Sequence, residues 1–230
     1  MTARSSTTHG PRVVGVIASR ADLSRALGMR KPPDLFELRL DHLAGIVEQL
    51  ENKLPRLRAP LIITARHPQE GGANNLSLRQ RRDLLTRFLP HADYVDVELR
   101  SASALRSLLM LAKHKKVRRI ISFHNFKSTP SLGVLMVKGR AAKACGANIF
   151  KVATLTDTPI EFTRLLDFVT RKNVNLPVAA MGIGKLGAIS RILLARAGSA
   201  LAYASVSTET DIEGQLSLEQ LRALGIASRR

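Results

Sequence analysis

The chain has 230 residues, of which 45% are hydrophobic. This length and composition suit one large α/β barrel or two small domains with a substantial core, and they exclude a disordered chain. The 36 Lys and Arg outnumber the 18 Asp and Glu, so the formal net charge of +18 would attract nucleic acid or anionic metabolites. The basic residues are dispersed, with short clusters at residues 113–119 and 229–230, and the sequence has no Trp on which bases could stack. We therefore interpret the charge mainly as a solvated surface and do not expect nucleic acid to be the partner.

The cellular setting is predicted from what the sequence lacks. No segment approaches the ~18 consecutive apolar residues that a membrane span needs, and the first residues are polar and have no apolar signal core. The single cysteine, Cys145, has no partner for a disulfide within the chain. We expect a soluble cytoplasmic protein that does not associate with a membrane.

Strands and helices are expected to alternate along the chain. Eight apolar runs rich in β-branched residues predict strands at residues 13–18, 35–40, 61–65, 94–99, 119–123, 149–153, 178–181 and 200–206. Apolar residues at three- and four-residue spacing predict helices at residues 41–51, 77–88, 101–114, 132–144, 159–171, 188–197 and 218–224. The repeated alternation favours a closed (β/α)8 TIM barrel over a doubly wound sheet, although periodicity alone is compatible with both. We expect a flexible tail over residues 1–10 and a single barrel domain over residues 11–230.

Polar side chains interrupt the ends of the predicted strands, where the catalytic groups of such barrels lie. Glu37 and Arg39 are two residues apart and face the same side of a strand, where they would meet a polyhydroxylated ligand or form a structural ion pair. Arg66 ends the next strand, and Glu70 follows it in a loop that contains two glycines. Glu70 is suited to orienting a histidine, but its composition equally fits a solvated loop acid.

The strongest catalytic candidates follow on the next two strands. His124 would be a lateral neighbour of Lys151, and its pKa suits a proton carrier, although a lone histidine is more often structural. Lys151 lies between apolar residues in GANIFKVAT. Burial and nearby cations would lower its pKa and leave a free amine that attacks a ketone to form an imine. Spacing alone leaves an equal alternative, in which the ammonium pairs with a carboxylate such as Glu98.

Two further candidates lie near the end of the chain. Arg191 follows a run containing Gly182, Gly184 and Gly187, and its forked guanidinium suits a carboxylate. The glycines lack the spacing of a dinucleotide fingerprint, so we expect no nucleotide cofactor. Gln215 lies in a polar loop after the last strand that would close over a ligand. No motif has metal-ligand spacing, and imine chemistry needs no metal.

Seven motifs follow one another along the chain: FELRLDHL, TARHPQEGG, YVDVELR, ISFHNF, GANIFKVAT, AMGIGKLGAISR and EGQL. In this order they resemble the type I 3-dehydroquinate dehydratases of the shikimate pathway of aromatic amino-acid biosynthesis, and the resemblance covers nearly the whole chain. It implies a (β/α)8 barrel, commonly a homodimer, that acts without a cofactor. It also implies that Lys151 forms an imine with 3-dehydroquinate, while His124 removes the C2 proton and assists loss of the C1 hydroxyl to give 3-dehydroshikimate. The other implied roles are orientation of His124 by Glu70, hydroxyl binding by Glu37, Arg39 and Arg66, and carboxylate binding and lid closure by Arg191 and Gln215.

The sequence departs from the family pattern in the predicted lid. The family has a small hydroxyl residue four positions before the Gln, whereas this chain has Asp211, so Thr208 or Thr210 would have to supply the hydroxyl. Two alternatives to the dehydratase therefore remain. One is an aldolase-like imine enzyme with another substrate, and the other is a non-catalytic homologue that binds an anionic partner.

Overall fold

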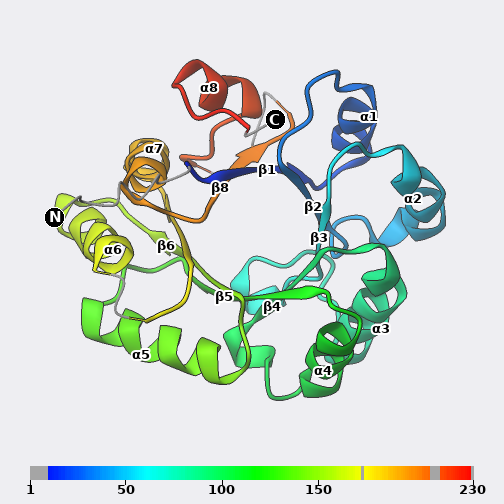
Figure 1. Ribbon diagram of the computed structural model, residues 1–230, viewed down its shortest axis with the longest axis horizontal. Coiled ribbons are helices and arrows are strands. Elements are labelled where there is room, and N and C mark those ends of the chain that lie inside the picture. The colour runs from blue at the N-terminus through cyan, green and yellow to red at the C-terminus, as the bar shows by residue number, and fades with distance from the viewer. Residues whose placement is uncertain (1–9, 172–173, 208–212, 229–230) are drawn as a thin grey trace, which may run out of the picture.

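The structure is a computed structural model that describes residues 10–171, 174–207 and 213–228. Its strands form the wall of a barrel that the helices surround (Figure 1). The parallel strands are β1 (Arg12–Ile17), β2 (Leu35–Arg39), β3 (Leu61–Thr64), β4 (Tyr94–Glu98), β5 (Arg118–Asn125), β6 (Ile149–Leu155), β7 (Val178–Ile183) and β8 (Leu201–Ser205). The α-helices are α1 (Arg20–Gly28), α2 (Val47–Lys53), α3 (Leu78–Phe88), α4 (Arg106–His114), α5 (Leu132–Ala144), α6 (Pro159–Thr170), α7 (Gly187–Ala197) and α8 (Leu218–Ala223). The predicted (β/α)8 barrel is confirmed.

The helix boundaries follow local capping more closely than apolar spacing. Helices α3 and α6 begin after capping boxes, in which the side chains of Ser77 and Thr158 accept hydrogen bonds from the backbone three residues on. Short 3-10 turns occupy part of the segments predicted as the starts of α2 and α4, so both helices begin later than expected. Helix α1 was not predicted, because its buried apolar side chains are only Leu23 and Ala26. No helix in the described ranges is long and apolar enough to cross a membrane.

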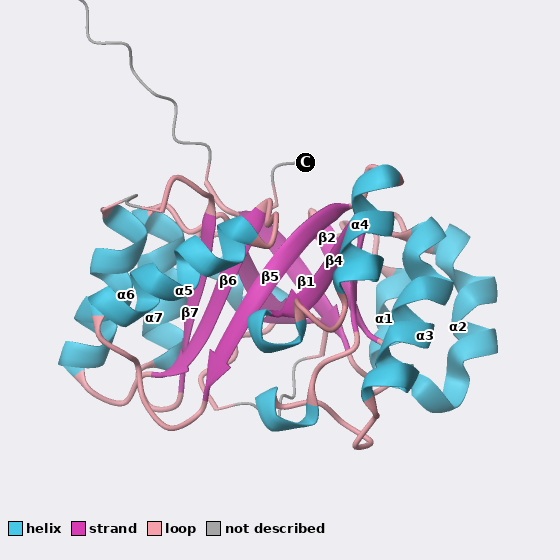
Figure 2. Ribbon diagram, turned by 90° about the horizontal axis from the view of Figure 1, so that it is seen from below, coloured by secondary structure: helices cyan, strands magenta, loops and turns pink. Residues whose placement is uncertain are grey.

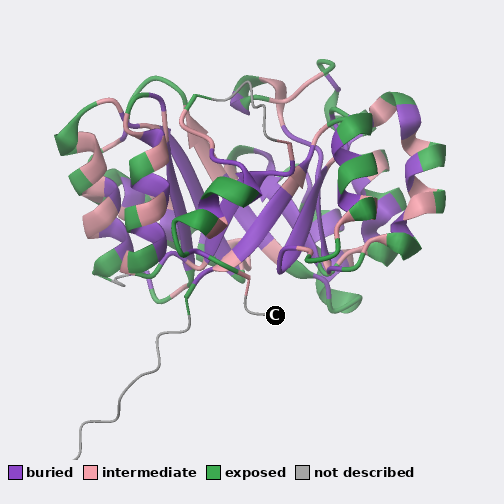
Figure 3. Cartoon of the chain, turned by 90° about the horizontal axis from the view of Figure 1, so that it is seen from above, coloured by how far each residue is buried: buried purple, intermediate pink, exposed green. Residues whose placement is uncertain are grey.

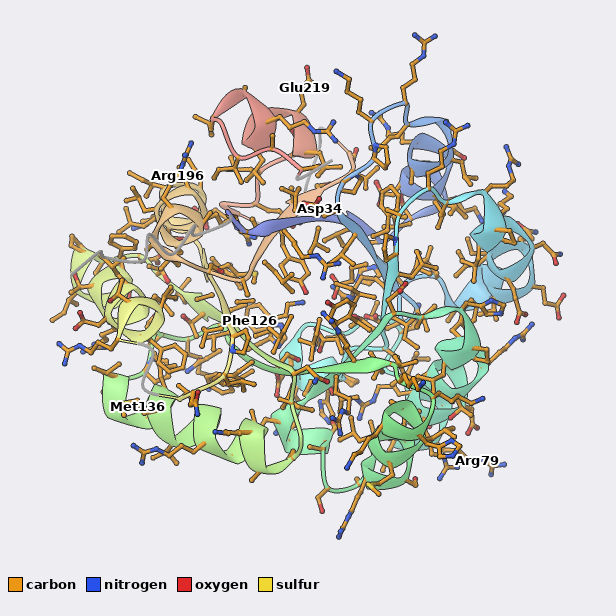
Figure 4. The ribbon with its side chains drawn as sticks, viewed as in Figure 1. Asp34, Arg79, Phe126, Met136, Arg196 and Glu219 are labelled. Atoms are coloured by element: carbon orange, nitrogen blue, oxygen red, sulfur yellow. The ribbon has the colours of Figure 1, made fainter. Side chains whose placement is uncertain are left out.

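The barrel has an apolar layer between its strands and helices and a second apolar layer inside. Figure 3 shows that the strands are almost wholly buried and that the helices are exposed on their outer faces. Side chains of the strands fill the space that they enclose (Figure 4). The inner apolar layer is formed mainly by residues near the amino ends of the strands, namely Val14, Leu35, Ile62, Tyr94, Ile120, Ile149 and Leu201.

A polar layer lies directly above this inner apolar layer. Side chains alternate along a strand, so the residue two positions further on also faces the interior. In several strands that next residue is polar, namely Glu37, Thr64, Asp96, Ser122, Lys151 and Tyr203. The barrel therefore has an apolar floor at its amino end and carries its charged groups toward its carboxyl end.

The seam between β7 and β8 is bridged partly by side chains. Over the described residues, backbone ladders join every other neighbouring pair of strands. At the seam, Ser199 Oγ accepts a hydrogen bond from Ala180 N at 3.1 Å. Beside it, Ser190 Oγ of helix α7 accepts a hydrogen bond from Gly182 N of β7 at 3.0 Å. A Cβ at Gly182 would overlap Ser190 Oγ, so glycine at this position permits the close approach of α7 to β7.

We expect Ser190→Ala to destabilise the protein by about 1–3 kcal/mol, because the buried Gly182 N–H would lose its acceptor. Urea unfolding followed by circular dichroism measures the change. Thr163→Ala is the matched control, since this exposed hydroxyl bonds only within its own helix and its loss should change stability by less than about 0.5 kcal/mol. Equal stabilities of Ser190→Ala and the wild type would show that the serine does not stabilise the contact between α7 and β7.

Candidate active site

A cavity of about 270 Å³ lies at the carboxyl ends of the strands. In Figure 2 the arrowheads of β5, β6 and β7 all point to this end of the barrel. Its lining includes all eight residues that the sequence analysis assigned to the site, namely Glu37, Arg39, Arg66, Glu70, His124, Lys151, Arg191 and Gln215. Residues from six strands or the segments that follow them therefore converge on one concave site.

Lys151 lies deeper in the barrel than a residue at a strand end. It is the third residue of β6, which continues to Leu155, and its side chain is 5% exposed. Its Nζ lies 3.2 Å from Glu37 Oε1, 3.1 Å from Asp96 Oδ2 and 4.0 Å from the centre of the Tyr203 ring. The predicted cationic neighbours of Lys151 are thus replaced, at hydrogen-bond distance, by two carboxylates.

Asp96 is the carboxylate that Lys151 shares with Arg66. The Arg66 guanidinium donates to both oxygens of Asp96, at 3.0 and 2.9 Å, and to Ser122 Oγ at 2.6 Å. Burial acts to raise the pKa of Asp96, but Arg66 and Lys151 outweigh burial and lower it. Asp96 is therefore charged near neutral pH and holds two cations at the base of the cavity.

Lys151 does pair with carboxylates, as the alternative expected, but Glu98, the acid named for that pairing, is not one of them. The Glu98 carboxylate lies 3.2 Å from Arg66 NH1 and 2.9 Å from Arg81 NH1, and it accepts a hydrogen bond from His67 N at 2.9 Å. Arg81 comes from α3 and was missed by sequence reasoning. Its one local signal is a basic residue on the buried side of an amphipathic helix.

His124 and Glu70 form a hydrogen-bonded pair. Glu70 Oε2 lies 2.9 Å from His124 Nδ1 and also accepts the backbone N–H of His124 at 3.0 Å. Burial, followed by the charges of Arg66 and Lys151, places the pKa of His124 well below its usual value. Near neutral pH the imidazole is therefore uncharged. With Nδ1–H donating to Glu70, Nε2 is left as the basic nitrogen.

The pKa of Glu70 is raised to about 7 by burial and by the nearby charge of Glu98. Between about pH 4.5 and 7 the folded protein therefore binds more protons at Glu70 than the unfolded chain, so folding stability falls as the pH rises through this window. In Glu70→Gln this loss of folding free energy between low and neutral pH should be smaller than in the wild type by roughly 1–3 kcal/mol. Urea unfolding at pH 5 and pH 7.5 measures it. Glu48→Gln, at an exposed site, should keep the wild-type pH dependence, and the same dependence in Glu70→Gln would contradict the raised pKa.

Arg39 and Glu37 do not pair with each other, contrary to one of the two expectations. Arg39 forms a two-pronged ion pair with Asp41, at 3.0 and 2.7 Å, and donates to Gly71 O at 2.8 Å. Glu37 instead accepts hydrogen bonds from Lys151 and, at 2.8 Å, from Thr64 Oγ1. The two side chains line the same cavity but belong to different networks.

Arg191 connects helix α7 to the end of the barrel wall. Its guanidinium donates to Gly214 O at 3.0 Å and to Tyr203 O at 3.2 Å. Burial lowers the pKa of Arg191 to about 10. Gly187 lies against Gly214 so closely that a Cβ there would come within 2.9 Å of Gly214 Cα. The glycine run therefore permits close backbone packing beside Gln215, while Thr208, Thr210 and Asp211 lie outside the described residues.

Two aromatic residues of the cavity were missed by sequence reasoning. Tyr203 lies under Lys151, and Phe126 is stacked near His124 with ring centres 6.4 Å apart and ring planes 17° apart. Phe126 comes directly after β5 and two residues after His124, so continuing the alternation of β5 by one residue could have indicated it. Tyr203 could have been found from its place two residues after the inward-facing Leu201.

Fold and site together define a class: a (β/α)8 barrel enzyme with a buried lysine beside a His–Glu pair. Residues 16–226 match the family model described as type I 3-dehydroquinase. The chain belongs to the type I 3-dehydroquinase family. The sequence resemblance to this family is thereby confirmed.

Individual relatives agree with this assignment. The chain is 31% identical over 207 residues to a 3-dehydroquinate dehydratase of Shouchella clausii, covering 84% of this chain and 80% of the relative. It is 35% identical over 195 residues to the one of Pyrococcus abyssi, covering 83% and 86%. The crystal structure of the Geobacillus kaustophilus 3-dehydroquinate dehydratase is similar with a TM-score of 0.83 and 26% identity, covering 93% of this chain and 89% of that one.

Proposed function

We propose that the protein converts 3-dehydroquinate to 3-dehydroshikimate through an imine on Lys151, in the shikimate pathway. The observation that carries this proposal is the position of Lys151. Its buried ammonium is held by two carboxylates at the base of a cavity, and the His124–Glu70 pair lines the same cavity. A ketone that enters the cavity would meet a primary amine and a basic imidazole together.

The first step is condensation of the Lys151 amine with the substrate ketone. Glu37 and Asp96 are the carboxylates in contact with Nζ. Arg66 holds both oxygens of Asp96, so Glu37 is the acid better placed to accept the proton that the ammonium must lose. Attack of Nζ on the carbonyl carbon forms the C–N bond, and the carbonyl oxygen leaves as water. The resulting iminium is again a cation beside the same two carboxylates, so the buried charges stay matched.

The second step is elimination. His124 removes the proton from C2, and the iminium accepts the electron pair to give an enamine. The C1 hydroxyl then leaves as water after accepting a proton from the protonated His124, and hydrolysis of the imine releases the product and Lys151. Glu70 would keep Nε2 basic by accepting Nδ1–H, and it would stabilise the imidazolium between the two proton transfers.

The remaining predicted roles concern substrate recognition. We assign the substrate carboxylate to Arg191 and Gln215, and the hydroxyls to Glu37, Arg39 and Arg66. Arg191 is buried, and it donates hydrogen bonds to backbone carbonyls, so an anionic ligand would stabilise the charged guanidinium against the cost of burial. Arg66 also makes several bonds to protein side chains, so a substrate contact would be added to these bonds. The predicted homodimer stays a prediction.

The imine is tested by trapping. Wild-type protein incubated with 3-dehydroquinate and borohydride should gain a reduced adduct that peptide mapping locates on Lys151. His124→Ala should still be trapped, while its turnover falls by about 10²–10⁴-fold because only the proton carrier is removed. Intact-mass spectrometry and a product assay measure both effects.

The same experiment separates the alternatives. A wild-type adduct with 3-dehydroquinate but no dehydration would favour an aldolase-like imine enzyme. Folded wild-type protein that gives neither adduct nor product would favour a non-catalytic homologue. Normal turnover by Lys151→Met would refute the imine mechanism altogether.

Recognition of the carboxylate predicts a change mainly in KM. Arg191→Lys should raise the KM for 3-dehydroquinate by about 10- to 100-fold with a smaller effect on kcat, because a lysine cannot donate the two parallel hydrogen bonds of a guanidinium. Steady-state kinetics measure the change. Arg196→Lys, at an exposed site on the same helix, is the control and should leave KM unchanged. An unchanged KM in Arg191→Lys would remove Arg191 from the substrate site.

A further inference from the structure

A second hollow, of about 490 Å³, lies at the amino ends of the strands. This is the end of the barrel opposite the arrowheads in Figure 2. It includes part of the basic cluster at residues 113–119, which the proposed function does not use. The residues of its lining that matter here are Arg12, Asp93, Tyr94, Lys115, Lys116 and Arg118.

The centre of this amino-end hollow is a tyrosine held between two arginines. Arg12 NH1 donates to Tyr94 Oη at 2.5 Å, and Arg118 NH1 donates to the same oxygen at 2.9 Å. Both guanidinium carbons also lie over the Tyr94 ring, 5.3 and 5.7 Å from its centre. Tyr94 itself is buried in the apolar floor of the barrel. Tyr94 therefore fixes the positions of the two guanidinium groups and holds them close to each other.

The charges of the amino-end hollow are not matched by acids. Within the described ranges, none of Arg12, Lys115, Lys116 and Arg118 forms an ion pair with a carboxylate. The acid in the lining, Asp93, accepts the backbone N–H of Leu61 at 2.9 Å. Guanidinium groups that share one acceptor repel each other, and an anion between them would remove this repulsion.

We propose that the amino-end hollow binds a small polyanion that carries two or more phosphate groups. Guanidinium forks suit phosphate oxygens, and the two arginines are close enough together to share one phosphate group. While Tyr94 Oη accepts from both arginines, its own hydrogen is still able to donate to a phosphate oxygen. Lys115 and Lys116 border the same space and supply the charge for a second phosphate group.

A small ligand fits better than nucleic acid. The cations surround a hollow, and the tyrosine ring is covered by guanidinium groups and has no free face on which a base could stack. The hollow is also separated from the catalytic cavity by the apolar floor and the polar layer above it. Binding there therefore does not require any residue of the proposed reaction.

Inorganic tripolyphosphate is the probe, and calorimetric titration at about 50 mM and 150 mM salt is the measurement. Arg12→Gln/Arg118→Gln should weaken its binding by roughly tenfold or more, because two charge-assisted contacts are lost. The control is Arg79→Gln/Arg82→Gln, which makes the same change in net charge on α3. Arg79 lies at the outer edge of the molecule (Figure 4), and the control should weaken binding less than about twofold.

Tyr94→Phe provides an independent variant, since it removes the shared acceptor and keeps all charges. It should weaken tripolyphosphate binding by a few fold. Turnover of 3-dehydroquinate, or the circular dichroism spectrum if no turnover exists, verifies that the variants are folded. Equal losses in the two double variants would show a general charge effect and overturn the proposal. Binding that is lost only in Arg191→Lys, or tight binding of a short oligonucleotide but not of tripolyphosphate, would overturn it as well.

Discussion

The ion pair that Asp96 forms with both Lys151 and Arg66 is the interaction on which the rest of the site depends. Asp96 is fully buried, and a carboxylate in that position is strongly destabilising unless cations and hydrogen bonds surround it. Arg66 fixes both of its oxygens, which leaves Lys151 held beneath the cavity at a defined point. Loss of Arg66 would therefore displace the proposed nucleophile as well as remove a charge from the cavity wall.

The surrounding fold explains how a charged layer can exist inside a barrel. The cations Lys151, Arg66 and Arg81 are matched by the acids Glu37, Asp96 and Glu98, so the buried cluster is neutral. The apolar floor beneath it excludes water from below, and helix α3 contributes one of the cations from outside the barrel. An iminium in place of the ammonium would preserve this neutrality, which is why the network suits a reaction that proceeds through a bound cation.

Sequence patterns predicted the strands and the barrel, and a polar residue at the inward end of an apolar run indicated Glu37, Arg39, Arg66, His124 and Lys151. Glu70, Arg191 and Gln215 follow strands or lie in a helix, and they were assigned from that context and from the resemblance to the family. Sequence patterns did not predict which acid holds Lys151. Asp96 and Glu98 both face inward from β4. In the ladders Glu98 pairs with Ser122 and Ser122 pairs with Lys151, so strand register alone would favour Glu98. Arg81 from helix α3 holds Glu98 instead, and Lys151 bonds to Asp96. Arg81 was missed for a related reason, since its contact with Glu98 joins a helix to a strand wall. Local sequence patterns do not show which side chains on different strands and helices form ion pairs with each other.

The arginines at the two ends of the barrel differ in the groups that hold them. At the carboxyl end, Arg39 and Arg66 each have a carboxylate at hydrogen-bond distance, so these two charges are largely neutralised. Arg191 differs from them, since it donates to backbone carbonyls. At the amino end, Arg12 and Arg118 are held by a neutral hydroxyl, which fixes their positions without reducing their charge. The net charge of +18 is therefore not distributed evenly over the solvated surface. Where it is both fixed and unmatched, its field is directed into a hollow, and there an anion gains the most from binding.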